Sequence, residues 1–294
     1  MNWFYLALLA SAIYALVVII DDNMVRKVYP KPIFGAIISG LLALLPLLSL
    51  FFVDITIPKP SLIITAMVAG SLFVFAGFMY FESLLKEAPP IVAALWGLTP
   101  AFVPFLAFFF LKETLTINQY VGFILILGSS LAISAVDIKK FKLSPVFYTM
   151  LIASILIAFE SILLKYLFNN IDYWSGFIFV SLGMGAAAIF LMIAFKDGRK
   201  FPSDLIKVKK WMGIFFITEI LAIIGFIVHA LAVSGGPVSL VKVIEGTLAI
   251  YVLLFAILFY PFFPKLLREA THGNIPRKLI FMAVILIGLY IMNI

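Results

Sequence analysis

The sequence has no cysteine and only two histidines, His229 and His272. Disulfides, thiolate metal sites and cysteine nucleophiles are therefore excluded. The two histidines lie far apart in sequence, which argues against a histidine-rich metal site. The chain also lacks HExxH, GxSxG and GxxxxGK motifs. We therefore expect no enzymatic activity, no ATP hydrolysis and neither a metal nor another cofactor.

Charged residues are scarce as well: they make up 12% of the 294 residues, whereas 65% are hydrophobic. A mean hydropathy of +1.21 is incompatible with the polar surface of a soluble globular protein, so we expect an integral membrane protein. The net charge of +7 is interpreted as contact of loop residues with lipid headgroups, and no nucleic acid partner is implied. Ala10-Ser11-Ala12 looks like a signal-peptide cleavage site, but no basic segment precedes it, so the first helix is expected to remain.

Ten apolar runs reach the length of about 20 residues that a helix needs to cross a bilayer. Because lipid offers no hydrogen bonds to a bare backbone, each run is expected to be helical. The predicted fold class is therefore all-α integral membrane, with ten transmembrane helices. The runs cover residues 3–22, 33–53, 62–85, 90–111, 118–136, 146–168, 173–195, 211–233, 237–262 and 276–293.

Parts of the sequence recur at offsets that are constant inside apolar runs and rise only at loops, which indicates a duplicated chain. The matched pairs are Leu84 with Leu231, Pro90 with Pro237, Asp22 with Glu160 and Lys27 with Lys165. Five spans in each half force the second half to enter from the opposite face, so the two five-helix repeats are predicted to be inverted. The first repeat would cover residues 1–136, a basic linker 137–145, and the second repeat 146–294.

Lysines and arginines are distributed unevenly between the two predicted faces. Seventeen of the 21 fall on one face and three, Lys59, Lys112 and Lys165, on the other, while Lys242 lies inside a span. Because cytoplasmic loops carry an excess of lysine and arginine, we expect a multi-pass protein of the cytoplasmic (inner) membrane, with its basic loops in the cytoplasm and both termini outside.

Several stretches resemble the EamA-type ten-helix transporters of the drug/metabolite transporter superfamily. They are residues 80–84 leading into Pro89-Pro90, the aliphatic run with Pro100, LKETLT at 111–116 and QYVGFILILGS from Gln119. A weaker copy follows at 236–256 and 279–290. In it Thr247 stands where the first copy has Pro100, and Phe259-Tyr260-Pro261 stands where a segment like Lys-Glu-Thr would be expected. Members of the superfamily are often assigned cytoplasmic termini, in conflict with the charge distribution. The resemblance implies a secondary carrier or exporter of small metabolites, with a central cavity between the repeats.

Ionisable side chains inside the spans are costly and therefore functional candidates. Glu245 lies one turn deeper than Lys242 on the same helix face, and His229 and Glu219 lie on the antiparallel neighbour. Together the four would line one wet cavity and bind substrate or a proton. The alternative for Lys242 and Glu245 is an internal pair that only neutralises itself. For His229, a packed interface histidine is the favoured interpretation and a place in the site is the alternative.

Further candidates are Glu160, which lies too far from Lys165 for a good same-face pair, and Glu82, which is close enough to its span end to reach the interface. Trp96 lies inside a span, where it is expected to pack in the protein or against lipid, with a place in the cavity lining alongside Tyr80 and Tyr14 as the alternative. Asp21 and Asp22 either contact lipid headgroups or line the cavity. Glu113 is expected to have a structural role, as a helix cap or in a pair with another side chain. The small residues of Ala36/Gly40, Gly128/Ala132, Ser181/Gly185 and Gly183/Ala187 predict tight helix packing within one protomer, with a homodimer interface as the alternative.

The function favoured is secondary transport of a small metabolite, such as an amino acid or an amphipathic solute, across the membrane by alternating access. The partners are then a small-molecule substrate and membrane lipid. Translocation of a lipid or a lipid-linked intermediate is the alternative, because it differs from metabolite transport only in the shape of the cavity. A membrane scaffold without transport activity is the third reading. Substrate, direction and coupling ion do not follow from the residues.

Overall fold

The computed structural model describes residues 2–134, 146–261 and 275–292, and within them it consists of helices without strands. The predicted linker 137–145 and the basic loop 263–274 lie outside the described residues. The helices are α1 (Trp3–Lys27), α2 (Pro32–Leu42), η1 (Leu45–Phe51), α3 (Pro60–Lys86), α4 (Pro89–Trp96), α5 (Thr99–Leu111), α6 (Ile117–Ser134), α7 (Phe147–Phe168), α8 (Tyr173–Ala194), η2 (Gly198–Lys200), α9 (Phe201–Lys207), η3 (Lys209–Trp211), α10 (Met212–Gly235), α11 (Val238–Glu245), α12 (Leu248–Phe259) and α14 (Ile275–Met292).

Every one of the ten predicted ranges contains helix. Within the described residues, seven helical segments are long and apolar enough to cross a membrane. They are Trp3–Lys27, Pro32–Phe51, Pro60–Lys86, Phe147–Phe168, Tyr173–Ala194, Lys209–Gly235 and Val238–Phe259. Thr99–Leu111 and Ile117–Ser129 are shorter apolar helices. The chain is therefore an all-helical, multi-pass membrane protein.

Two of the ranges predicted as single helices are broken near their middle. Residues 90–111 divide into α4 and α5 around Gly97-Leu98, and residues 237–262 divide into α11 and α12 around Gly246-Thr247. In the first break, glycine weakens the helix and Pro100 cannot donate a backbone hydrogen bond to the preceding turn. The second break has a glycine but no proline. The two breaks lie 149 residues apart, close to the offset that relates Pro90 to Pro237.

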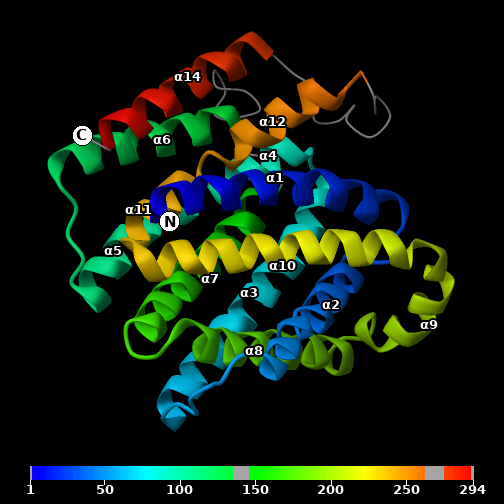
Figure 1. Cartoon of the computed structure of the whole chain (residues 1–294). Helices are drawn as coiled ribbons and strands as arrows, with labels where there is room; N and C mark the ends of the chain where they lie inside the picture. Colours follow the sequence, from blue (N-terminus) through cyan, green and yellow to red (C-terminus); the bar gives the residue numbers. More distant parts are fainter. Residues whose placement is uncertain (1, 135–145, 262–274, 293–294) are drawn as a thin grey trace.

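The two halves pack into each other rather than side by side. α1 of the first half runs along α10 of the second, and α7 of the second half runs along α3 of the first (Figure 1). In the same way α12 contacts α1 and α5 contacts α7, while the broken helices meet through α5 with α11 and α4 with α12. α6 and α14 pair with each other at one edge of the bundle. The centre of the bundle is thus built from both halves.

The LKETLT segment closes α5 and organises the helices around it. Lys112 ends α5 in the left-handed region with φ 58°. The two carboxylate oxygens of Glu113 accept hydrogen bonds from the backbone N–H groups of Val238 and Ser239, each at 3.0 Å, and so cap the start of α11. Thr116 and Gln119 form a reciprocal capping box at the start of α6. The structural role expected of Glu113 is confirmed.

Glycines bring α3 and α8 into backbone contact. A Cβ atom at Gly70 would overlap the Val180 carbonyl oxygen, and one at Gly183 would overlap the backbone of Met67. Gly40 and Gly185, from the other small-residue pairs, face Ala188 and Leu44 of the same chain. These glycines therefore serve packing within the protomer, where small residues allow helices to approach closely.

We predict that Gly183→Ala lowers the thermal stability of the protein in detergent, by about 2 kcal/mol, because neither backbone can yield without moving a helix. Gly213→Ala is the matched control, since a Cβ atom at Gly213 has no neighbour within 4 Å and alanine is the better helix former. Equal melting temperatures for the two variants, measured by intrinsic fluorescence, would contradict the assigned contact.

Candidate functional site

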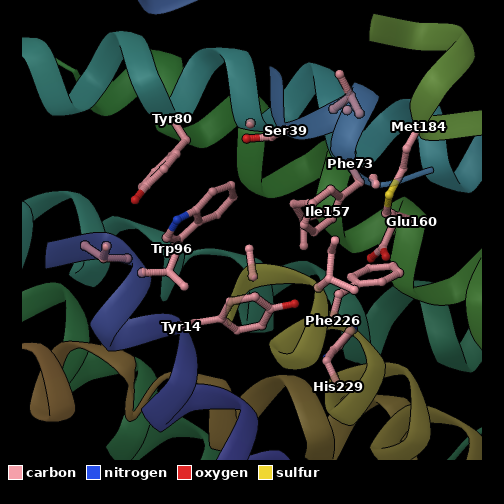
Figure 2. A pocket seen from close by; sticks show the side chains of 18 of the residues that line it. Tyr14, Ser39, Phe73, Tyr80, Trp96, Ile157, Glu160, Met184, Phe226 and His229 are labelled. Carbon is pink, nitrogen blue, oxygen red and sulfur yellow. The ribbon is translucent and has the colours of Figure 1, made fainter. Parts of the chain in front are cut away.

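A central cavity of about 210 Å³ lies between the halves and reaches both helix breaks. Its walls come from α1, α2, α3 and the α4–α5 break of the first half, and from α7, α8, α10 and the α11–α12 break of the second. Most of the lining is apolar, with a few ionisable groups set into it. Figure 2 shows a part of this lining, from Tyr80 and Trp96 at one end to Glu160 and His229 at the other.

Three of the predicted candidates form a compact cluster at the α11–α12 break. Lys242 donates a hydrogen bond to Glu245 Oε2 at 2.8 Å, and its Nζ lies 3.3 Å from His229 Nε2. The other imidazole nitrogen, Nδ1, contacts Glu245 Oε1. An ammonium group only donates, so with Lys242 as an ammonium group we assign His229 Nε2 as the acceptor and place the imidazole proton on Nδ1, which faces Glu245. In this assignment the triad contains a neutral imidazole, one positive and one negative charge.

Glu160 lies on α7 and is 1% exposed. Its Oε2 accepts a hydrogen bond from Ser161 at 2.9 Å, and its Oε1 has no hydrogen-bond partner within the described part of the chain. The same is true of the buried hydroxyl of Tyr14 on α1. Figure 2 shows that hydroxyl directed toward the end of the cavity where Glu160 and Phe226 lie. The expected separation of Glu160 from Lys165 is confirmed, because Lys165 instead donates to the carbonyl groups of Val233 and Ser234.

Two more carboxyl groups line the cavity, and each receives one hydroxyl hydrogen bond. Ser39 of α2 donates to Glu219 Oε1 at 2.6 Å, and Tyr80 of α3 donates to Asp21 Oδ2 at 3.1 Å. Asp21 is 4% exposed, so of the two roles left open for it the structure supports the cavity. Asp22 instead points to the helix end and pairs with Arg26 at 2.6 Å.

Aromatic side chains form two groups in the lining. Trp96 lies against Tyr80, with ring centroids 5.9 Å apart. Phe226 contacts Phe73 at 4.9 Å and Phe177 at 5.5 Å. Trp96 and Tyr80 both belong to the cavity lining, which is the alternative given for Trp96 from the sequence.

Of the candidates named from sequence, eight line the cavity: Tyr14, Tyr80, Trp96, Glu160, Glu219, His229, Lys242 and Glu245. Glu82 does not. Glu82 lies two residues from Tyr80 on α3, which is a rotation of about 200° around the helix. Because Tyr80 faces the cavity, Glu82 lies on the opposite face of α3.

Sequence reasoning missed Ser39, Phe177 and Phe226 and left Asp21 undecided. A signal for Asp21 was present, because Ser11, Tyr14, Val18 and Asp21 recur at intervals of three and four residues and so share one face of α1, the face that lines the cavity. No comparable polar stripe marks α2 or α8.

The comparisons with known proteins agree with this arrangement. The model of the EamA-like transporter family matches residues 1–135, the whole first half up to the end of α6. This half belongs to the EamA-like transporter family. The resemblance to the drug/metabolite transporter superfamily is thereby confirmed.

The fold of the chain as a whole also has a known counterpart. A solved structure titled "Crystal structure of protein" superposes with a TM-score of 0.66 and 15% identity, covering 99% of this chain and 95% of its own. At that identity the similarity speaks for the fold alone. A search of curated proteins gives no match.

We predict that Lys242→Met destabilises the protein by about 3 kcal/mol, because it leaves the Glu245 carboxylate without its cation. The double variant Lys242→Met/Glu245→Gln should recover most of this loss, since it removes both charges. Thermal unfolding in detergent of the two single variants and the double variant gives the coupling energy. Losses that simply add would show that the pair contributes nothing.

Proposed function

We propose that this EamA-like protein is a secondary transporter that carries a small metabolite, an amino acid or an amphipathic solute, across the cytoplasmic membrane by alternating access. One observation carries the proposal: the cavity lies between two interleaved halves, touches both helix breaks and contains several carboxyl groups inside the spans. Transporters of this kind bind substrate near the bilayer midplane at broken helices. Ionisable groups at this depth mark substrate or proton sites by default.

The proposal includes ten crossings in two inverted repeats, residues 1–136 and 146–294 joined by the linker 137–145. Matching contacts support it. Arg26 near the end of α1 donates to the carbonyl groups of Leu84 and Glu87 at the end of α3. Lys165 near the end of α7 donates in the same way to Val233 and Ser234 at the end of α10. Each half thus ties its first long helix to the end of its third.

We place the basic face in the cytoplasm and both termini outside, by the excess of lysine and arginine. Aromatic contacts bring the basic helix ends together. Phe34 at the start of α2 packs against Phe201 of α9 at 4.9 Å and against Phe215 of α10 at 5.9 Å, while Arg26 joins the ends of α1 and α3. The described basic residues of these segments are Arg26, Lys27, Lys31, Lys86, Lys196, Arg199, Lys200, Lys207, Lys209 and Lys210.

Alternating access requires two helix contacts that tighten in turn. α3 with α8 and α10 with α2 are the pairs that an inverted repeat relates. The first pair is in backbone contact at Gly70 and Gly183, whereas the second is held by side chains, Ser39 with Glu219 and Phe34 with Phe215. We propose that transport alternates between a state in which the α3–α8 contact is the tighter one and a state in which the α2–α10 contact is.

The test fills the cavity without disturbing the packing. Gly77 lines the cavity, and a Cβ atom there has no neighbour within 4 Å. We predict that Gly77→Phe abolishes stabilisation by any metabolite that raises the melting temperature of the unmodified protein, and also abolishes uptake of that metabolite by proteoliposomes.

Gly213→Phe is the matched control, because Gly213 is exposed on α10 with no neighbour within 4 Å, and it should keep binding and uptake. Uptake that survives in Gly77→Phe would overturn the assigned cavity. Stabilisation by lipids alone, together with lipid flip-flop in the same vesicles, would identify a lipid translocase instead.

A further inference from the structure

The cavity contains more acidic than basic groups. Lys242 and Glu245 neutralise each other, and His229, which accepts from one and donates to the other, adds no charge. Asp21, Glu160 and Glu219 remain, and the described residues lining the cavity supply no further lysine or arginine. A buried carboxylate without a countercharge is costly, and such a group otherwise takes up a proton. A solute that brings a positive charge stabilises the ionised form of these carboxyl groups, and one that brings a carboxylate destabilises it.

Glu160 and Tyr14 supply an acceptor pair at one end of the cavity. Glu160 Oε1 and the Tyr14 hydroxyl are buried and have no partner among the described residues, and both residues line the cavity. A carboxylate only accepts hydrogen bonds, and a hydroxyl oxygen can also accept them. An ammonium group has three N–H donors and no acceptor, so it matches this pair.

The walls next to this pair are aromatic. Phe226, which contacts Phe73 and Phe177, lies beside Glu160 in the cavity (Figure 2). Aromatic faces attract cations by about 0.5–2 kcal/mol, the more so where water is excluded, and they bury the apolar part of a solute. The same end of the cavity therefore offers a carboxylate for a charge and rings for a hydrocarbon body.

We propose that the cavity selects compact organic cations with an apolar or aromatic body, whose ammonium nitrogen binds between Glu160 and Tyr14. It discriminates against the corresponding amino acids, because the positive charge of Lys242 is already used by Glu245 and no other cation in the described lining meets their carboxylate. This inference deepens the proposed transport function and rests on it, since it names the class of solute.

The experiment compares three solutes that share one ring: 2-phenylethylamine, phenylalanine and 3-phenylpropionate. Their dissociation constants are measured by thermal shift and calorimetry on the full-length protein in detergent at one pH and ionic strength. We expect the amine to bind at least tenfold more tightly than phenylalanine and the acid to bind most weakly. Glu160→Gln should weaken amine binding at least tenfold, and Tyr14→Phe severalfold.

Glu82→Gln is the control, because it makes the same chemical change on a half-buried carboxyl group outside the cavity; it should leave the order and the affinities unchanged. Equal or tighter binding of phenylalanine or of the acid overturns the inference, and so does a failure of all three solutes to bind. The solute order in the unmodified protein decides the matter even where a variant folds poorly.

Failure of the inference and failure of the proposed function give different results. Proteoliposomes that take up phenylalanine but not the amine would retain the transporter and overturn the cation preference. Tight binding of the amine without uptake of any solute would retain the site and overturn the transport function.

Discussion

Lipid supplies neither hydrogen bonds nor countercharges, and this constraint decides where the buried ionisable groups of the described spans lie. The helices satisfy their own backbones, so the remaining cost falls on side chains. Asp21, Glu160, Glu219 and the Lys242–Glu245 pair all turn to one shared cavity, while Asp22 and Glu113 are paired or used as caps at helix ends. The cavity exists because the chain gathers its polar groups away from lipid.

The breaks in α4–α5 and α11–α12 follow from the same constraint. A break in a helix frees backbone groups that lipid cannot satisfy, so it is tolerated only where protein or a cavity surrounds it. Trp96 and Thr99 flank the first break, Glu245 and Leu248 the second, and all four line the cavity. In each half the helix is interrupted beside residues that line the cavity. The duplication of the chain therefore supplies the cavity with one break from each half.

Helices could be located from sequence because apolar length and proline punctuation are local signals. The structural role of Glu113 was expected from its position at a span end, and the pairing of Lys242 with Glu245 was one of two alternatives that their spacing left open. The rotation of each helix was harder to predict. Tyr80 and Glu82 were both named, although residues two apart cannot face one cavity, and on a nearly all-apolar α3 nothing in the sequence decided between them. The breaks at Gly97 and Gly246 were both missed, since glycine is common inside membrane helices, and at the second break Thr247 gives no signal of its own.

The tautomer of His229 links the fold to selectivity. Because Lys242 is held at 2.8 Å from Glu245 and directs a further proton at the imidazole, a solute carboxylate could reach this ammonium group only by displacing one of the two. Displacing Glu245 would leave a fourth uncompensated carboxylate beside Asp21, Glu160 and Glu219. Displacing His229 would leave a buried imidazole nitrogen without its donor. Lys242, the one lysine among the described residues that line the cavity, is therefore paired within the protein, and the groups that remain for a solute are carboxyl groups.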